Sequence, residues 1–205
     1  MSSKLNWLIT NTLPGSVILQ SWLTIHGISP SLAQKYTTSN WLTKLSSGVY
    51  FRPGRIPEWQ DIIHSLQIQK ELPIHLAGIS SLAYQGKSHY LQFNHEAVWV
   101  SLNNKAYLPS WFNSIGEYHW QVISNSKIND MDTSDLTQVE IKNTSISASS
   151  VELAIFEVLE SVPKHISFEH AAELFQGMVN LRPKIIQSLL ERNNSIKSNR
   201  LFLFL

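Results

Sequence analysis

The fold is decided by the stretch ISPSLAQKYTTSNWLTKLSSGVYFR, residues 28–52. Ser29 is typical of a helix N-cap, and Pro30 fits the first helical position because that position donates no backbone hydrogen bond within the helix. The apolar residues that follow recur at helical spacing and predict a helix over 29–40. Two β-prone runs separated by a serine pair then predict a hairpin over 41–52.

Two more helices are expected upstream of this stretch and one downstream. Residues 5–13 have apolar side chains at helical spacing and stop at a Pro-Gly pair, which breaks helices. Ser16 is expected to cap a second helix, which a tight turn joins to the helix of 29–40. A helix over 58–70 follows the hairpin. This order is typical of a winged helix-turn-helix domain, which we assign to residues 1–71.

The N-terminal third is more basic than the rest of the chain. Residues 1–70 hold six Lys and Arg against two acidic residues, whereas residues 71–205 hold ten against thirteen. A helix-turn-helix places its second helix in the major groove of DNA, and the wing reaches the adjacent phosphates. The side chains expected to contact DNA are therefore Ser31, Gln34, Lys35, Thr37, Thr38, Lys44, Arg52 and Arg55. Gln34 and Lys35 are expected to read bases, and the cations on or beside the wing to contact phosphates.

The remainder of the chain predicts a mixed α/β domain over residues 72–205, with a small sheet and C-terminal helices, so the fold class is α+β. Alternating apolar residues predict strands over 75–77, 90–93, 98–100, 119–123 and 138–142. Helical spacing and capping residues predict helices over 150–160, 168–178 and 183–191. The last five residues, after Arg200, form an apolar run typical of the interior of an element, so the natural chain is expected to continue past Leu205.

Composition excludes several classes of protein. The 205 residues include no cysteine, which excludes disulfides and thiolate metal sites and fits a reducing cytoplasm. No apolar run approaches the ~20 residues that a membrane-spanning helix needs, so we expect a cytoplasmic protein with no membrane contact. The sequence contains no glycine-rich phosphate loop, nucleophile elbow or zinc-type histidine spacing. We therefore expect no catalytic residue, no metal and no cofactor.

One acidic constellation leaves an enzymatic alternative open. Asp130, Asp132 and Asp135 precede Glu140 and Lys142, which stand on a predicted strand. An acidic pair with a lysine is compatible with a nuclease that holds Mg²⁺ and activates water. The simpler interpretation is an exposed strand face, because a Glu-x-Lys triplet is common. A metal-dependent nuclease with winged-helix targeting is one alternative, and a transcription factor with a ligand-sensing C-terminal domain is another.

Short strings in both halves of the chain resemble one family, the AbiEi antitoxins of abortive-infection, type IV toxin-antitoxin systems. In the N-terminal half the strings are Leu13-Pro14-Gly15, Trp22-Leu23, His26-Gly27-Ile28-Ser29, Trp41-Leu42, Gly48-Val49-Tyr50 and Arg52-Pro53-Gly54. In the C-terminal half they are Leu82 to Gly86, His89-Tyr90-Leu91, Ser149 to Ile155, Ser167-Phe168-Glu169, Asn180 to Pro183 and Arg200 to Leu203. The order and spacing of these strings match the family, and together they cover essentially the whole chain.

The resemblance implies a regulator in two parts. Its N-terminal winged helix would bind inverted repeats in the promoter of its own operon as a repressor, and its C-terminal domain would counteract a toxin with the nucleotidyltransferase fold. A basic cluster in that domain is either a second surface, for DNA, RNA or the antitoxin role, or a solvated helical face, which we favour. The cluster consists of Arg182, Lys184, Arg192, Lys197 and Arg200.

Overall fold

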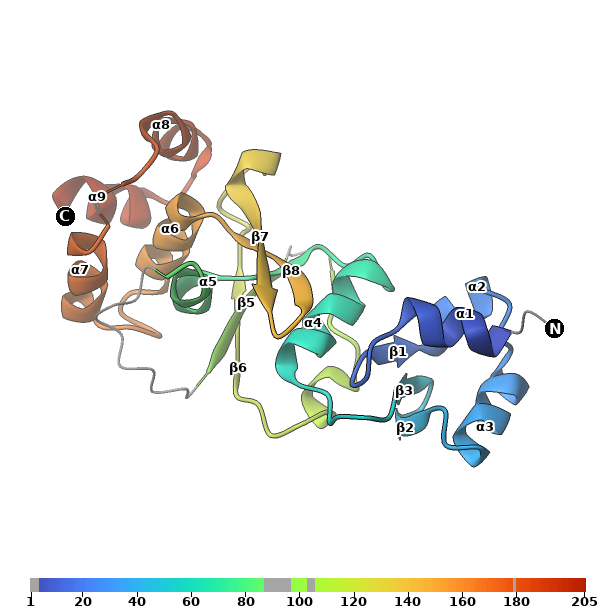
Figure 1. The fold of residues 1–205 in the computed structure, drawn as a ribbon. Coiled ribbons are helices and arrows are strands. Elements are labelled where there is room, and N and C mark those ends of the chain that lie inside the picture. The colour runs from blue at the N-terminus through green and yellow to red at the C-terminus, as the bar shows by residue number, and fades with distance from the viewer. Residues whose placement is uncertain (1–3, 87–96, 103–105, 179) are drawn as a thin grey trace. The chain divides into compact units, whose positions relative to one another are not determined.

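The computed structural model describes residues 4–86, 97–102, 106–178 and 180–205, and these residues form two compact units (Figure 1). Unit one combines Met1–Leu72 with Leu108–Tyr118, and unit two combines Pro73–Tyr107 with His119–Leu205. The predicted combination of helices with small sheets is confirmed. No helix in the described ranges has both the length and the apolar character needed to cross a membrane.

Unit one begins with a helix and a strand and continues with two helices, a hairpin and a longer helix (Figure 1). The elements are α1 (Lys4–Asn11), β1 (Val17–Leu19), α2 (Gln20–Ile25), α3 (Pro30–Thr38), β2 (Thr43–Ser46), β3 (Val49–Phe51), α4 (Trp59–Ile68) and the 3-10 turn η1 (Phe112–Ser114). The three strands pair antiparallel in the order β1-β3-β2. Ile18 of β1 and Tyr50 of β3 join apolar side chains of the first three helices in one core.

The helix predicted from residue 29 begins where its sequence signals indicate. The Ser29 side chain accepts a hydrogen bond from the backbone N–H of Leu32 at 3.3 Å, and Pro30 occupies the first turn. Ala33 is fully buried, so it fixes the face that α3 turns toward the core. The turn before it needs Gly27, whose φ of 79° lies in the left-handed region. These local signals set both the start and the orientation of α3.

The prediction of a helix that starts after Ser16 is wrong for its first turn. Residues 17–19 instead form β1, in which Val17 pairs with Phe51 and Leu19 pairs with Val49. All three β1 side chains are buried, which a strand between two layers allows. On the free side of β1, the Gln69 amide accepts from the Leu19 N–H at 2.8 Å and donates to the Val17 carbonyl at 2.7 Å. Partners distant in the sequence therefore outweigh the local helical pattern.

Unit two contains a five-stranded mixed sheet and a group of helices. Its strands are β4 (Ile74–Leu76), β5 (Val98–Leu102), β6 (Trp120–Ser124), β7 (Leu136–Ile141) and β8 (Thr144–Ser149), in the order β6-β5-β4-β8-β7. Its helices are α5 (Gly78–Tyr84), η2 (Thr133–Asp135), α6 (Val151–Ser161), α7 (Phe168–Gln176), α8 (Pro183–Arg192) and α9 (Ile196–Phe204). The helix α6 contacts all four other α-helices of the unit and is largely buried.

Most elements predicted for this half are present, and three further elements, α5, β8 and α9, were not predicted from the sequence. The strand over 144–149 escaped prediction because its sequence, TSISAS, contains only two apolar residues, Ile146 and Ala148. The helix over 196–204 escaped prediction because polar residues dominate its first turns. The predicted strand over 90–93 lies outside the described residues.

Candidate nucleic-acid interface

Four polar side chains share the outward face of α3. With about 100° between successive helical residues, Ser31, Gln34, Lys35 and Thr38 fall within one arc on the side opposite Ala33. All four are exposed. The fifth residue predicted on this helix, Thr37, is half-buried and lies outside the arc, on the side toward Ala33. The helix therefore presents one continuous polar stripe with a single charge.

Hydrogen bonds on this stripe decide which groups remain available. The hydroxyls of Thr37 and Thr38 both donate to the Gln34 carbonyl, at 2.7 and 3.1 Å. The Ser31 hydroxyl shares a hydrogen bond of 3.0 Å with that of Ser29. Within the described part of the chain, neither the Gln34 amide nor the Lys35 ammonium has a partner. These two groups are free to bind a ligand.

The hairpin adds one exposed cation to the candidate residues of unit one. Lys44 lies on β2 opposite Tyr50 of β3, and its side chain is exposed without a partner among the described residues. The turn of the hairpin passes through Gly48, whose φ is 69°. Because Lys44 is part of β2, the pairing of β2 with β3 fixes the position of its backbone.

Arg52, predicted to contact phosphate, has a structural role in unit one. Its guanidinium donates to the carbonyl of Ile9 at 2.7 Å and also to the carbonyl of Thr12. The last carbonyls of a helix lack partners within the helix and carry partial negative charge. Arg52 therefore caps the end of α1, and these contacts turn its guanidinium inward.

Arg55, the other arginine predicted to contact phosphate, forms a paired salt bridge with Asp61. Both guanidinium-to-carboxylate distances are 2.6 Å, and the Asp61 side chain is only 3% exposed. The Asp61 carboxylate also accepts from the Glu58 N–H at 2.8 Å, which closes a capping box at the start of α4. The hydrogen bonds that Arg55 donates to Asp61 raise the pKa of Arg55 above its ordinary value. This arginine therefore joins the loop after the hairpin to α4.

Two Pro-Gly pairs of unit one lie against each other. The N–H of Gly15 donates to the Arg52 carbonyl at 2.8 Å. A Cβ added to Gly54 would come within 2.8 Å of the Pro14 Cβ, and one added to Gly15 within 2.6 Å of the Arg55 Cγ. The side chains of Arg55 and Pro14 therefore pack too close to Gly15 and Gly54 to leave room for a Cβ. The strings Leu13-Pro14-Gly15 and Arg52-Pro53-Gly54 describe one packed junction rather than a ligand site.

Three cations of the C-terminal basic cluster are also bound within their own unit. Arg192 contacts both carboxylate oxygens of Asp135 at 2.9 Å, and Asp135 is fully buried. The Lys197 ammonium donates to the backbone carbonyls of Glu160 and Val162. Arg182 binds a buried glutamate, as described next. Lys184 and Arg200 are exposed and have no partner among the described residues.

The pair formed by Arg182 and Glu152 predicts a pH dependence of stability. Arg182 donates to the Glu152 carboxylate through its backbone N–H at 2.8 Å and through its guanidinium at 2.6 Å. Burial alone would raise the pKa of Glu152, but the hydrogen bonds from Arg182 outweigh it and lower the pKa below its ordinary value. Because the pKa of Glu152 is lower in the folded than in the unfolded protein, its ionised form stabilises the fold at pH values above the ordinary carboxyl pKa. This stabilisation is lost as the pH falls through the folded-state pKa.

We therefore expect Glu152→Gln to flatten the loss of stability between about pH 5 and pH 3, because glutamine does not titrate. The measurement is urea denaturation of both proteins across that range. Replacing the exposed Glu173 by glutamine is the control and should leave the pH profile almost unchanged. An identical profile for Glu152→Gln and the parent would contradict this prediction.

The acidic residues considered for a nuclease are held in structural contacts or, among residues that the structure describes, stand alone on a strand. Asp135 is committed to Arg192, Asp132 accepts from the Ser134 N–H at the start of η2, and Glu140 is exposed on β7. No group of three or more histidine, aspartate or glutamate side chains in the described ranges is placed to hold a metal ion. The nuclease alternative therefore has no metal site among these residues.

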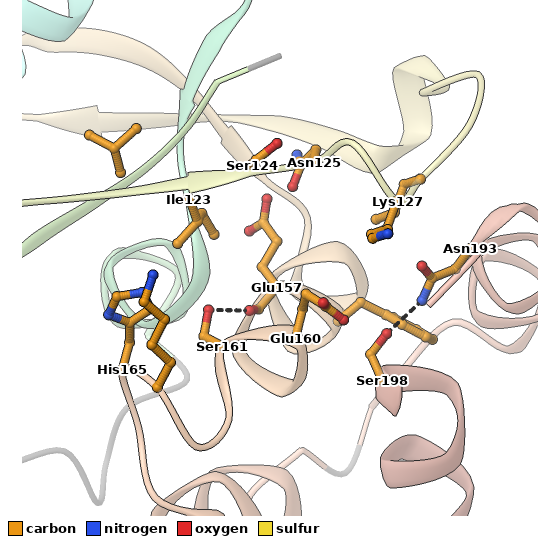
Figure 2. Close-up of a pocket in the computed structure, with 14 residues that line it drawn as sticks. Ile123, Ser124, Asn125, Lys127, Glu157, Glu160, Ser161, His165, Asn193 and Ser198 are labelled. Atoms are coloured by element: carbon orange, nitrogen blue, oxygen red, sulfur yellow. Dashed lines mark hydrogen bonds between the residues drawn. The ribbon is translucent and has the colours of Figure 1, made fainter. Parts of the chain in front are cut away.

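Unit two contains a cavity of about 280 Å³ beside β6 and α6 (Figure 2). Glu157 of α6 points toward Asn125 at its upper wall, and Lys127 lies above Glu160. Burial and the nearby charge of Lys164 lower the pKa of His165. These residues come from segments far apart in the sequence, so no local pattern indicated the cavity. A small ligand could bind in this cavity, and the ligand-sensing alternative stays a prediction.

A buried hydrogen-bond network extends from this cavity to the centre of the sheet. The Glu157 carboxylate accepts from the ring of His75 at 3.0 Å, from the N–H of Gly78 at 2.8 Å and from the hydroxyl of Ser149 at 2.6 Å. Both His75 and Glu157 are buried. The network connects β4, α5, β8 and α6, and its first role is to satisfy polar groups within the core.

The chain is similar to known proteins over nearly its whole length. The crystal structure of the RV2827C protein from Mycobacterium tuberculosis is similar over 97% of this chain and 74% of that chain, with a TM-score of 0.59 and 17% identity, which relates the folds alone. No curated protein matches the chain. The family model described as "Transcriptional regulator, AbiEi antitoxin N-terminal domain" matches residues 1–93, and "Transcriptional regulator, AbiEi antitoxin, Type IV TA system" matches residues 95–205. The two matches leave almost no residue uncovered, and the chain therefore belongs to the AbiEi antitoxins, transcriptional regulators of type IV toxin-antitoxin systems.

Proposed function

We propose that unit one is a winged helix-turn-helix domain that binds double-stranded DNA and represses transcription of its own operon. The observation that carries the proposal is the element order α1-β1-α2-α3-β2-β3 with an antiparallel sheet ordered β1-β3-β2. In this arrangement α3 is the recognition helix and the β2–β3 hairpin is the wing. The polar stripe on α3 and the exposed Lys44 supply the groups that such a domain uses.

The two arginines predicted at the wing have a different part in this proposal. Arg52 and Arg55 hold the ends of α1 and α4 in place, because their guanidinium groups are bound to carbonyls and to Asp61. Phosphate contact is therefore assigned to Lys44, and groove contact to Ser31, Gln34, Lys35 and Thr38. Inverted repeats upstream of the gene are the proposed target, and the bound state is the repressed one.

The antitoxin activity is assigned to the residues after 71, and the proposed partner is a toxin with the nucleotidyltransferase fold. Membership of the AbiEi family supports an antitoxin role. The exposed Lys184 and Arg200 are the members of the basic cluster that remain free to contact a partner. Co-expression with the toxin tests this assignment: restored growth of the host is the expected result, and unrelieved toxicity would contradict it.

The DNA-binding role predicts a change in salt dependence when Lys44 is removed. We expect Lys44→Ala to weaken binding to the upstream duplex and to lower the slope of log K against log salt by about 0.9, the value for one phosphate contact. The measurement is fluorescence anisotropy with the full chain at several salt concentrations. Lys70→Ala, with the same charge change in unit one, should keep the parent slope. Equal slopes for Lys44→Ala and the parent would remove the wing from the interface.

A further inference from the structure

The outward stripe of α3 has a composition that favours one kind of base pair. It contains no arginine, the side chain that most often reads guanine through two hydrogen bonds. Its one planar group with both a donor and an acceptor is the amide of Gln34, which is exposed and free of partners among the described residues. Glutamine matches the N6 and N7 atoms of adenine in the major groove.

Thr38 presents a methyl group on the same stripe. Its hydroxyl donates to the Gln34 carbonyl at 3.1 Å, so the polar branch of the side chain is already satisfied within the helix. The side chain is exposed, and the other branch is the methyl group. A thymine displays its own C5-methyl group in the major groove, which an apolar branch of this size can contact.

The spacing of the two side chains suits neighbouring base pairs. Gln34 and Thr38 are four residues apart, which is about one helical turn of 5.4 Å. Successive base pairs rise by about 3.4 Å along each strand. The two side chains therefore face positions one or two base pairs apart.

We infer that α3 reads A·T base pairs, with the Gln34 amide on an adenine and the Thr38 methyl group on a nearby thymine. This inference rests on the proposed DNA-binding role of unit one. The Lys35 ammonium extends the same face and is the group through which a guanine at the edge of the site would be contacted. Gln34 and Thr38 are thus specificity-determining residues.

The first arm of the test selects binding sites from a pool of duplexes with a random 20-base-pair centre, using the full chain. Selected sites are expected to share a core with A·T pairs at two positions. Gln34→Met keeps the length and neutrality of the side chain but loses both hydrogen bonds to adenine. We expect it to bind the selected duplex about tenfold to a hundredfold more weakly and to lose the A·T preference at one position.

The second arm replaces single thymines of the selected duplex by uracil, which removes only the C5-methyl group. At one position the parent is expected to lose about fourfold in affinity, the value for burying one methyl-sized group. Thr38→Ser keeps the hydroxyl and its bond to Gln34 but lacks the methyl group, so it should not distinguish thymine from uracil there. Thr24→Ser is the matched control: it removes the methyl group of an exposed threonine of α2 whose hydroxyl donates to the Gln20 carbonyl at 2.8 Å, and it should respond to uracil as the parent does.

The outcomes separate the inference from the function on which it rests. A selected core of G·C pairs, or indifference to uracil at every position, would overturn the A·T assignment while salt-dependent DNA binding persists. Failure to bind any duplex at low salt would instead reject the DNA-binding role itself. Circular dichroism of each variant establishes that a loss of affinity does not come from unfolding.

Discussion

Replacing Arg55 by methionine is expected to lower the free energy of unfolding of unit one by about 3 kcal/mol, since the change leaves the buried carboxylate of Asp61 without its cation. Methionine preserves most of the apolar stem that packs over Gly15, so the loss reports the charge pair rather than the packing. Hydrogen exchange of the full chain, followed on peptides of α4 in increasing urea, measures the effect.

The same variant decides between a structural role and a phosphate contact. If Arg55 is structural, the folded variant keeps the parent's slope of DNA affinity against salt, because no phosphate contact has been removed. Lys70→Met serves as the control for stability, because Lys70 is exposed and outside the pair. A variant with parental stability but a reduced salt slope would return Arg55 to the DNA interface.

A second large effect is expected in unit two from Arg192→Met. Asp135 is completely buried, and Arg192 contacts both of its carboxylate oxygens at 2.9 Å. Removing one partner of a buried pair typically costs about 3–5 kcal/mol, because the remaining charge cannot be solvated. We expect a loss of about 4 kcal/mol in urea denaturation, with increased exchange in α8 and β7.

A double variant identifies the cause of that loss. Asp135→Asn removes the charge that Arg192→Met leaves uncompensated, so combining the two changes should recover part of the lost stability. Arg200→Met, in which an exposed and unpaired arginine is replaced, should change stability by less than about 0.5 kcal/mol. Additive losses from the two changes at 135 and 192 would argue against an uncompensated charge as the cause.

The elements that could be predicted from the sequence are those whose causes are local. Ser29 caps the start of α3 by accepting from the Leu32 N–H, and Pro30 fits the first turn of the helix. Ser167 likewise caps α7 by accepting from the His170 N–H. The strand β1 could not be found in this way, because its partners are Phe51 and Gln69, more than thirty residues away.

For the candidate DNA-contact residues, exposure could be predicted from the sequence, but pairing within the chain could not. Gln34, Lys35 and Lys44 are exposed as their positions in the pattern predicted. Arg52 and Arg55 carry the same charge as Lys44, and a sequence does not distinguish a cation bound to its own chain from a free one. Asp61 is six residues from Arg55, but only the folded loop brings the two charges together.

The side chain of Gln69 completes the outer border of the β1-β3-β2 sheet. An open strand border offers backbone groups to any extended peptide and is a common origin of aggregation. The Gln69 amide binds the Leu19 N–H and the Val17 carbonyl, so neither group is left to pair with a strand of another molecule. Protection of this edge therefore needs one side chain and no additional strand.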